Sequence, residues 1–190
     1  MTRVSGPGPG IREVRVTDLE MTEPDQLRPG RTPSVEATFV LAARPAPELS
    51  RFFYRAVGGD WYWLDRLDWT LERWTQWVTA PGHELWTAWV DGTPAGYVEL
   101  EPDHVGGVEI AYFGLLPAYS GLGLGAWLLT RATERAWAID GTTRVWLHTC
   151  ELDSPAALHN YTARGFRPCG SSLEYWDTTA PSPGPWRGSR

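Results

Sequence analysis

The strongest chemical signal in the sequence is a glycine-rich turn. Gly121, Gly123 and Gly125 alternate with leucines, between an apolar strand-like segment and a helix-forming run. Glycine lets the backbone approach a ligand closely, and the free N–H groups and the dipole at the start of a helix favour an anion. We therefore expect amides in the range 121–126 to bind a phosphate or diphosphate.

Two other interpretations of this turn stay open. One is a tight turn that only packs a helix on a sheet. The other is a Rossmann-type dinucleotide turn, which needs G-x-G-x-x-G and an acidic residue about 20 positions further on. The chain has G-x-G-x-G, and Asp140 precedes the next predicted strand instead of ending it. These departures disfavour the Rossmann interpretation.

Composition excludes several kinds of chemistry. All 17 basic residues are arginine, against 23 acidic residues, so the formal net charge is −6. Without lysine there is neither a lysine-held pyridoxal phosphate nor a P-loop. An acidic chain without an arginine cluster is a poor nucleic-acid binder. Four scattered histidines and two cysteines give no zinc-ligand spacing, so we expect no metal site.

The chain shows no sign of export or membrane insertion. No apolar run approaches the roughly 18 residues that span a bilayer, and residues 1–10 lack the apolar core of a signal peptide. Cys150 and Cys169 are therefore expected to be reduced thiols. Neither has a convincing His or Asp partner for nucleophilic catalysis. We expect a cytoplasmic protein without nucleic-acid or membrane partners.

Periodicity predicts the elements that position the turn. We expect a single domain over 11–177, with flexible tails at 1–10 and 178–190. The order is mixed α/β, with an Asp91-Gly92 hairpin in a meander that feeds a crossover helix. Strands are predicted at 11–21, 35–41, 85–90, 95–101, 108–116, 144–150 and 166–176, the last bent near Gly170. Helices are predicted at 47–57, 70–80, 124–138 and 154–164.

Two motifs resemble those of the GCN5-related N-acetyltransferases (GNAT family). The first is an apolar strand end, a proline and then Gln/Arg-x-x-Gly-x-Gly/Ala, which the run 115–125 fills. The second is Asn-x-x-Ala-x-x-x-Tyr-x-x-x-Gly-Phe, which Ala157, Tyr161, Gly165 and Phe166 match. One helix and one strand separate the motifs, as in the family. The chain departs at Ser120, where the family usually has Gln or Arg.

The resemblance implies a splayed mixed β-sheet flanked by helices, with acetyl-CoA or another acyl-CoA between the two central parallel strands. The pantetheine would pair with the strand before the turn, and the diphosphate would take amides of the turn. The residues so implicated in cofactor binding are Tyr112, Gly114, Leu115, Leu116, Ser120, Gly121, Leu122, Gly123, Leu124, Gly125, Ala126, Asn160 and Tyr161.

Direct acyl transfer to an amine needs a base and a proton donor for the departing thiolate. Tyr161 matches the family's donor position; the alternative is a core aromatic. Glu109, in an apolar stretch, falls where the histone acetyltransferase branch carries its catalytic glutamate, and is the first choice of base. The alternative is a strand carboxylate that faces solvent or forms a salt bridge. Glu99 and His148 are further candidates, for the base or for substrate binding.

Six aromatic residues crowd the segment 61–77, where the family places its first helices and their loop. Three interpretations stay open: core packing, a cleft wall for the amine, or a dimer or partner surface. Trp61 and Trp63 are the candidates for substrate binding. Asp60, Asp65 and Asp68 interleave the rings and suit a cationic amine.

The sequence therefore predicts an acyl-CoA-dependent N-acetyltransferase that acts on a small-molecule or peptide amine by direct attack in a ternary complex, as a monomer or homodimer. A non-catalytic CoA-binding or interaction module on the same fold is the alternative. The acyl-chain length and the particular amine stay open.

Overall fold

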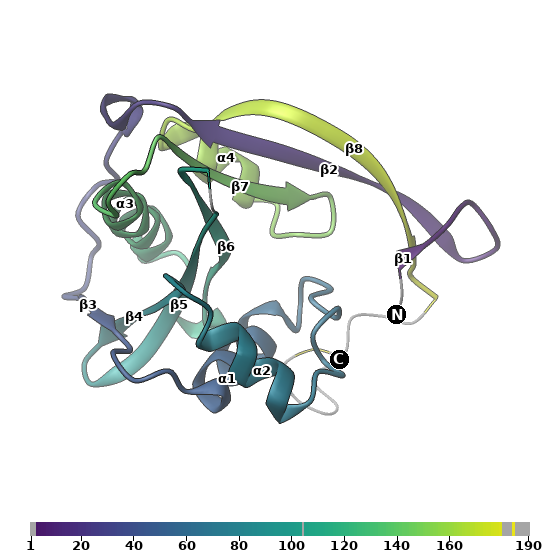
Figure 1. The fold of residues 1–190 in the computed structure, drawn as a ribbon, viewed down its shortest axis with the longest axis horizontal. Coiled ribbons are helices and arrows are strands. Elements are labelled where there is room, and N and C mark those ends of the chain that lie inside the picture. The colour runs from purple at the N-terminus through teal and green to yellow at the C-terminus, as the bar shows by residue number, and fades with distance from the viewer. Residues whose placement is uncertain (1–2, 104, 180–183, 185–190) are drawn as a thin grey trace.

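The computed structural model describes residues 3–103, 105–179 and 184 (Figure 1). Its strands form one mixed eight-stranded sheet in the order β1-β8-β2-β7-β6-β5-β4-β3. The strands are β1 (Arg3–Val4), β2 (Ile11–Met21), β3 (Thr38–Leu41), β4 (Glu84–Val90), β5 (Thr93–Pro102), β6 (Gly107–Leu115), β7 (Arg144–Cys150) and β8 (Arg167–Asp177). The helices are α1 (Pro47–Gly58), α2 (Leu71–Val78), α3 (Leu124–Trp137) and α4 (Ala157–Ala163), with 3-10 turns at Pro24–Gln26 and Pro117–Tyr119.

The sheet splits between its two parallel strands. β6 and β7 pair only from Gly107↔Arg144 to Glu109↔Trp146. Beyond Glu109, β6 continues with β5 as its partner, while β7 continues with β2. Figure 1 shows the two halves of the sheet diverging from this point. One edge of β6 beyond Glu109 therefore faces open space instead of a neighbouring strand, which confirms the splayed sheet.

Local sequence explains the elements around the split. Asp91 and Gly92 both have positive φ, 48° and 76°, as the predicted tight hairpin requires. The stripe Leu124, Leu128, Ala132 and Ala136 is fully buried against the sheet, so the predicted amphipathic face of α3 is confirmed.

Two elements begin at a later residue than the sequence predicts. The strand expected at 35–41 begins only at Thr38, where pairing with β4 begins. The helix expected at 154–164 spans Ala157–Ala163. The Asp153 carboxylate accepts bonds from Thr149 Oγ1 (2.7 Å) and the Cys150 amide (3.1 Å), which closes a turn after β7 and delays the helix.

The first long strand of the chain lies in the sheet between the last two strands of the chain. β2 lies between β7 and β8, and the register against β8 shifts between Asp18 and Leu19, opposite the expected bend near Gly170. Within the segment expected to be a loose tail, Arg3 and Val4 pair with Trp176 and Tyr175. No helix in the described part of the chain is both long and apolar enough to cross a membrane.

Candidate active site

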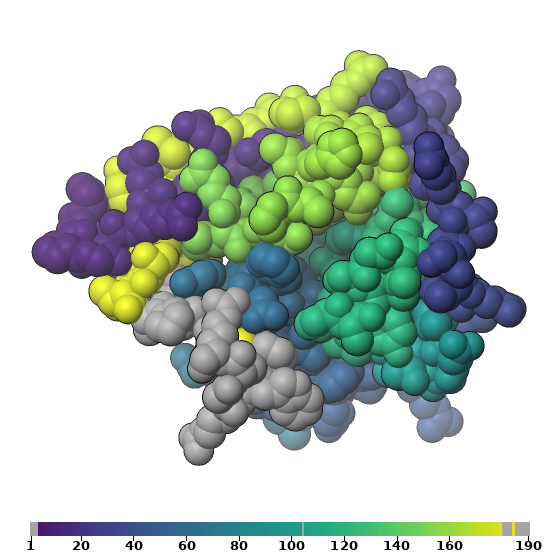
Figure 2. Space-filling model, turned by 180° about the vertical axis from the view of Figure 1, so that it is seen from behind, coloured from purple at the N-terminus to yellow at the C-terminus, as the bar shows by residue number. Residues whose placement is uncertain are grey.

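A cavity of about 1060 Å³ lies where the sheet splits. Its walls are β6 beyond the split, the glycine turn, α4, the ends of β7 and β8, and the loop between α1 and α2. Figure 2 shows the surface hollowed between α4, the glycine turn and the loop that follows α1. Of the residues expected to bind the cofactor, those that line the cavity are Tyr112, Gly114, Leu115, Ser120, Gly121, Gly123, Gly125, Ala126, Asn160 and Tyr161.

The glycine turn is shaped for an anion. Gly121 and Gly123 have φ of 82° and 79°, in the left-handed region, and Gly123 caps the start of α3. Among the described residues, the N–H groups from Gly121 to Ala126 have no hydrogen-bond acceptor. Successive free amides of this kind form a concave anion site.

The leucines of the turn serve a different purpose from its glycines. Leu124 is fully buried, and Leu122 packs against the same apolar cluster as Val90 and Ala95. Leu116 packs against the cluster that holds Phe53. None of these three leucines lines the cavity, so their predicted contribution is limited to the backbone.

Helix α4 brings a cation to the turn that the sequence analysis did not predict. Asn160 Nδ2 donates to the Gly125 carbonyl (3.3 Å), and Arg164 Nη1 donates to Asn160 Oδ1 (3.5 Å). Arg164 lines the cavity, and its buried Nε has no acceptor among the described residues. The only signal in the sequence was an arginine just before Gly165, which ends the helix.

Tyr161 combines a buried ring with access to the cavity. The ring packs edge-on against Phe113 and Phe166, and the residue is 8% exposed. Burial raises the pKa of its phenol well above the ordinary value, and the nearby Asp153 raises it further. The phenol therefore stays protonated near neutral pH and keeps a proton with which it can donate a hydrogen bond.

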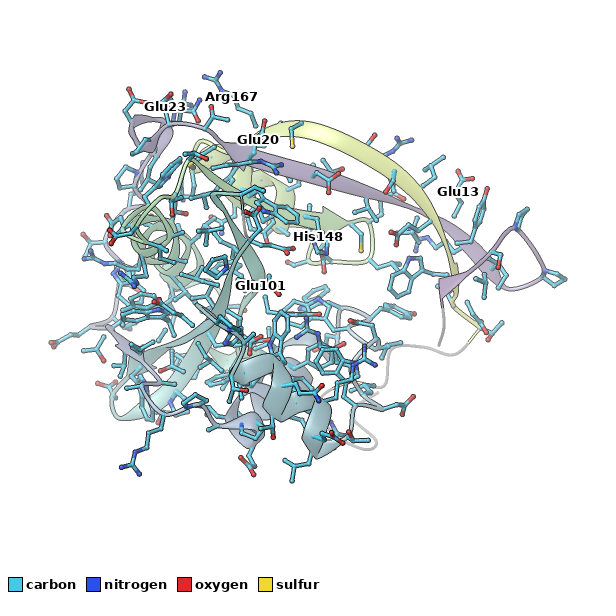
Figure 3. The ribbon with its side chains drawn as sticks, viewed as in Figure 1. Glu13, Glu20, Glu23, Glu101, His148 and Arg167 are labelled. Atoms are coloured by element: carbon cyan, nitrogen blue, oxygen red, sulfur yellow. The ribbon has the colours of Figure 1, made fainter. Side chains whose placement is uncertain are left out.

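Glu109 and His148 form a pair at the point where the sheet splits. Glu109 Oε1 lies 3.1 Å from His148 Nδ1, and His148 lines the cavity whereas Glu109 does not. Figure 3 shows His148 on the side of β7 that faces α1 and α2. The bond to Glu109 is the main cause that raises the pKa of His148, against the opposing effect of burial. Asp153 and Asp18 raise this pKa further.

Glu99 does not reach the cavity. Its carboxylate is 1% exposed and accepts hydrogen bonds from Ser50 and from Trp77 Nε1 (2.6 Å). Arg66 and His83 lie 3.9 and 3.7 Å from it. The structure thus places this candidate base in a buried charged cluster.

The aromatic segment 61–77 divides between core and cleft. Trp74 is 2% exposed and belongs to the core. Trp69 and Trp77, with Tyr112, hold the Arg66 guanidinium over their rings at 4.4, 3.7 and 4.2 Å. Trp61 and Trp63 line the cavity, and their role in substrate binding stays a prediction.

Cys150 also lines the cavity, but burial raises the pKa of its thiol to about 11. Few thiolates would be present near neutral pH, which disfavours a covalent route through Cys150.

The described residues contain no group of three or more His, Cys, Asp or Glu side chains that could hold a metal ion.

A splayed mixed sheet with a glycine turn of free amides at the split is typical of an acetyltransferase fold of the GNAT type. The model of the acetyltransferase (GNAT) family matches residues 46–166, and the chain belongs to this family. No curated protein sequence matches the chain.

Solved structures support the same fold. A GCN5-related N-acetyltransferase from Kribbella flavida is 23% identical, with a TM-score of 0.62, and the match covers 90% of this chain and 61% of that one. The corresponding protein from Sphaerobacter thermophilus is 16% identical, with a TM-score of 0.65, over 88% of this chain and 52% of that one. A GNAT acetyltransferase from Streptococcus pneumoniae is 24% identical, with a TM-score of 0.57, over 74% of this chain and 98% of that one. The chain thus spans only 61% and 52% of the length of the first two.

Proposed function

We propose that the chain is an N-acyltransferase that transfers an acyl group, most simply acetyl, from acyl-CoA to an amine in a ternary complex. The observation that carries this proposal is a single cavity lined by the glycine turn with its free amides, by Tyr161 and by His148. The residues present fit acyl-CoA, because a strand edge without a partner can pair with pantetheine amides and the amides at 121–126 can bind a diphosphate.

Arg164 supplies the positive charge that the turn itself lacks. Ser120 is uncharged where the resemblance places Gln or Arg, and Arg131 forms an exposed ion pair with Glu134 at 2.9 Å. Arg164 lies beside Asn160, which is bonded to the first turn of α3. Arginine suits a diphosphate because its planar donors match phosphate oxygens.

Acyl-CoA supplies a thioester whose carbonyl carbon is attacked by the amine nitrogen while the carbon–sulfur bond breaks. The amine binds as an ammonium, so it must lose a proton before attack. Neutral His148 accepts that proton through Nε2, while Glu109 holds Nδ1 and stabilises the imidazolium that forms. Tyr161 donates a hydrogen bond to the departing sulfur, and the products are an amide, free CoA thiol and one proton.

Two measurements test the proposal. Calorimetric titration with acetyl-CoA should give a saturable one-to-one isotherm. Thiol release with a panel of amines should depend on both substrates. Absence of acetyl-CoA binding at millimolar ligand would refute the proposal. Binding without thiol release from any amine would instead favour a non-catalytic CoA-binding module.

A further inference from the structure

The half of the cavity remote from the glycine turn has a distinct chemical character. It is bounded by the loop between α1 and α2, by the end of β7 with its following turn, and by β8. The aromatic side chains on this wall, here called the acceptor wall, are Trp61, Tyr62, Trp63, Tyr112 and Trp176. The carboxylates are Asp65, Asp68, Asp153 and Glu174.

The aromatic part of the acceptor wall is held in place. Trp61 and Trp63 both donate their backbone N–H to the Gly58 carbonyl, at 2.9 and 3.3 Å. The Trp63 ring is so close to Gly58 that a Cβ there would lie 2.3 Å from it, and it meets Tyr112 edge-on with centroids 5.1 Å apart. A rigid aromatic surface of this kind favours a flat apolar or aromatic body in the ligand.

The carboxylates differ in their partners: Asp65 lies 3.8 Å from Arg66 Nε, whereas Asp68 and Asp153 have no cation as a partner among the described residues. Asp153 accepts hydrogen bonds from Trp63 Nε1 (3.1 Å), Thr149 Oγ1 (2.7 Å) and the Cys150 amide (3.1 Å), all of them neutral donors. Neutral donors stabilise the ionised form without cancelling its charge. Among the described residues, no cation lies within ion-pair distance of Asp153, and Asp68 has neither a hydrogen bond nor an ion pair.

Among the described residues, few cations lie on the acceptor wall. Arg66 is 8% exposed, and its guanidinium is held over the rings of Trp69, Trp77 and Tyr112. Arg164 lies beside the glycine turn, and the further basic side chains among the described residues that line the cavity are histidines, including His148. Such a wall attracts a cationic group and repels a carboxylate or phosphate on the acceptor.

We propose that the acceptor is an amine that a short chain joins to an aromatic ring, bound as the ammonium and without a carboxylate. The ring lies against Trp61 and Trp63, and the ammonium lies toward Asp153 and His148. This inference rests on the proposed function, because it names the substrate class of the same site.

The test compares amines that differ only in a carboxylate: tryptamine with tryptophan, and phenethylamine with phenylalanine. Binding to the protein saturated with CoA is measured by calorimetry, and kcat/KM by thiol release. The decarboxylated member of each pair should bind and react roughly tenfold better or more, which corresponds to about 1.4 kcal/mol. Spermidine, a cation without a ring, should be weaker than tryptamine.

Asp68→Asn should narrow the difference between tryptamine and tryptophan. Asp140→Asn, which removes the same charge from an exposed position outside the cavity, should leave it unchanged. Equal binding of the two members of each pair, or preferred binding of spermidine, would overturn the inference. If the binding preference holds but no amine reacts, the site binds amines of this class and the proposed acyl transfer fails.

Discussion

His148 Nδ1 lies 3.1 Å from Glu109 Oε1, and Glu109 is the last residue at which β6 and β7 pair. The split of the sheet therefore opens the cavity directly beyond a hydrogen-bonded carboxylate–imidazole pair. His148 lines the cavity and Glu109 does not, so in the proposed mechanism the carboxylate predicted from the sequence as the base acts through the imidazole. This arrangement fixes one ring nitrogen and leaves the other for the substrate.

Replacement of Glu109 by Gln should move the pH dependence of kcat/KM. In the proposed mechanism neutral His148 is the base, so kcat/KM should rise as pH rises through its pKa. The Glu109 carboxylate raises that pKa, and its removal shifts the acidic limb to lower pH. His148→Gln should lower kcat by roughly 10²- to 10⁴-fold and abolish the limb. A pH–rate series on the three proteins measures this.

Glu101→Gln is the matched control, because Glu101 pairs in register with Glu109 on the neighbouring strand but forms no bond with His148 in the described structure. The acidic limb of the kcat/KM profile of Glu101→Gln should stay at the same pH as that of the unsubstituted protein. If Glu109→Gln abolishes activity at all pH values while His148→Gln retains it, Glu109 itself is the base and the assignment to His148 is wrong.

The same pair should make stability depend on pH. The pKa of His148 is raised in the folded state, so its contribution is fully present below the unfolded value of about 6.5 and is lost as pH rises through the folded value. Glu109→Gln should therefore destabilise the protein more at about pH 5.5 than at about pH 9. Urea unfolding at both pH values measures this, and an equal loss at both would contradict it.

Tyr161→Phe should lower turnover by roughly 10- to 10³-fold while acetyl-CoA binding is retained, because the substitution removes only the hydroxyl that we propose as donor to the sulfur. The raised pKa of Tyr161 means that no limb from its ionisation should appear near neutral pH. Tyr175→Phe is the control, since that hydroxyl bonds to Glu13 on the outer strands at 3.3 Å. Unchanged turnover in Tyr161→Phe would reject the donor role.

Most of the fold could be predicted because its signals are local. The strand Ile11–Met21, the Asp91-Gly92 hairpin and the buried stripe of α3 follow from periodicity and turn chemistry alone. The insertion of β2 between β7 and β8 depends on pairing between the two ends of the chain, which no local pattern records.

The residues of the candidate site likewise divide into those that local sequence predicts and those that depend on packing. The turn amides and Tyr161 could be placed because short motifs carry them. Arg164 was missed and Glu99 was placed in the site, because burial and distance depend on how α4 and α2 pack. Whether a tryptophan in 61–77 is core or cleft likewise depends on the loop conformation, in which the Gly58 carbonyl accepts the Trp61 and Trp63 amides.

Arg164→Ala should weaken CoA binding by roughly tenfold or more, since a charge-assisted bond to phosphate contributes about 1.5–3 kcal/mol. Binding of pantetheine, which lacks the diphosphate and nucleotide, should not change. Arg164→Lys should recover part of the affinity, and Arg131→Ala, on the exposed face of α3, should lose little. Calorimetry on these variants measures the effect. An equal loss of CoA affinity in Arg131→Ala would indicate long-range electrostatic attraction by positive charge and not a local contact of Arg164 with the diphosphate.

Gly121→Ala and Gly92→Ala form a matched pair. Both glycines have positive φ, 82° and 76°, and a Cβ at either position meets no atom within 4 Å. Each substitution should cost about 1 kcal/mol of unfolding free energy from left-handed backbone strain. Only Gly121→Ala should also weaken acetyl-CoA binding, because its methyl group stands on the anion-binding turn. Denaturant unfolding and calorimetry separate the two effects, and equal acetyl-CoA affinity in both variants would argue against the turn as the diphosphate site.

Glu99→Gln tests whether this carboxylate stabilises the fold or binds substrate. Its removal leaves Arg66 and His83 buried beside a neutral group, and breaking a buried ion pair by removing one partner costs about 3 kcal/mol. Glu84→Gln, which breaks the less buried pair with Arg135, should cost less than about 1 kcal/mol. Because Glu99 does not line the cavity, the KM for the amine in folded Glu99→Gln protein should change by less than about threefold, or roughly 0.6 kcal/mol. A large rise in that KM without loss of stability would show instead that Glu99 reaches the substrate, as the sequence alone suggested.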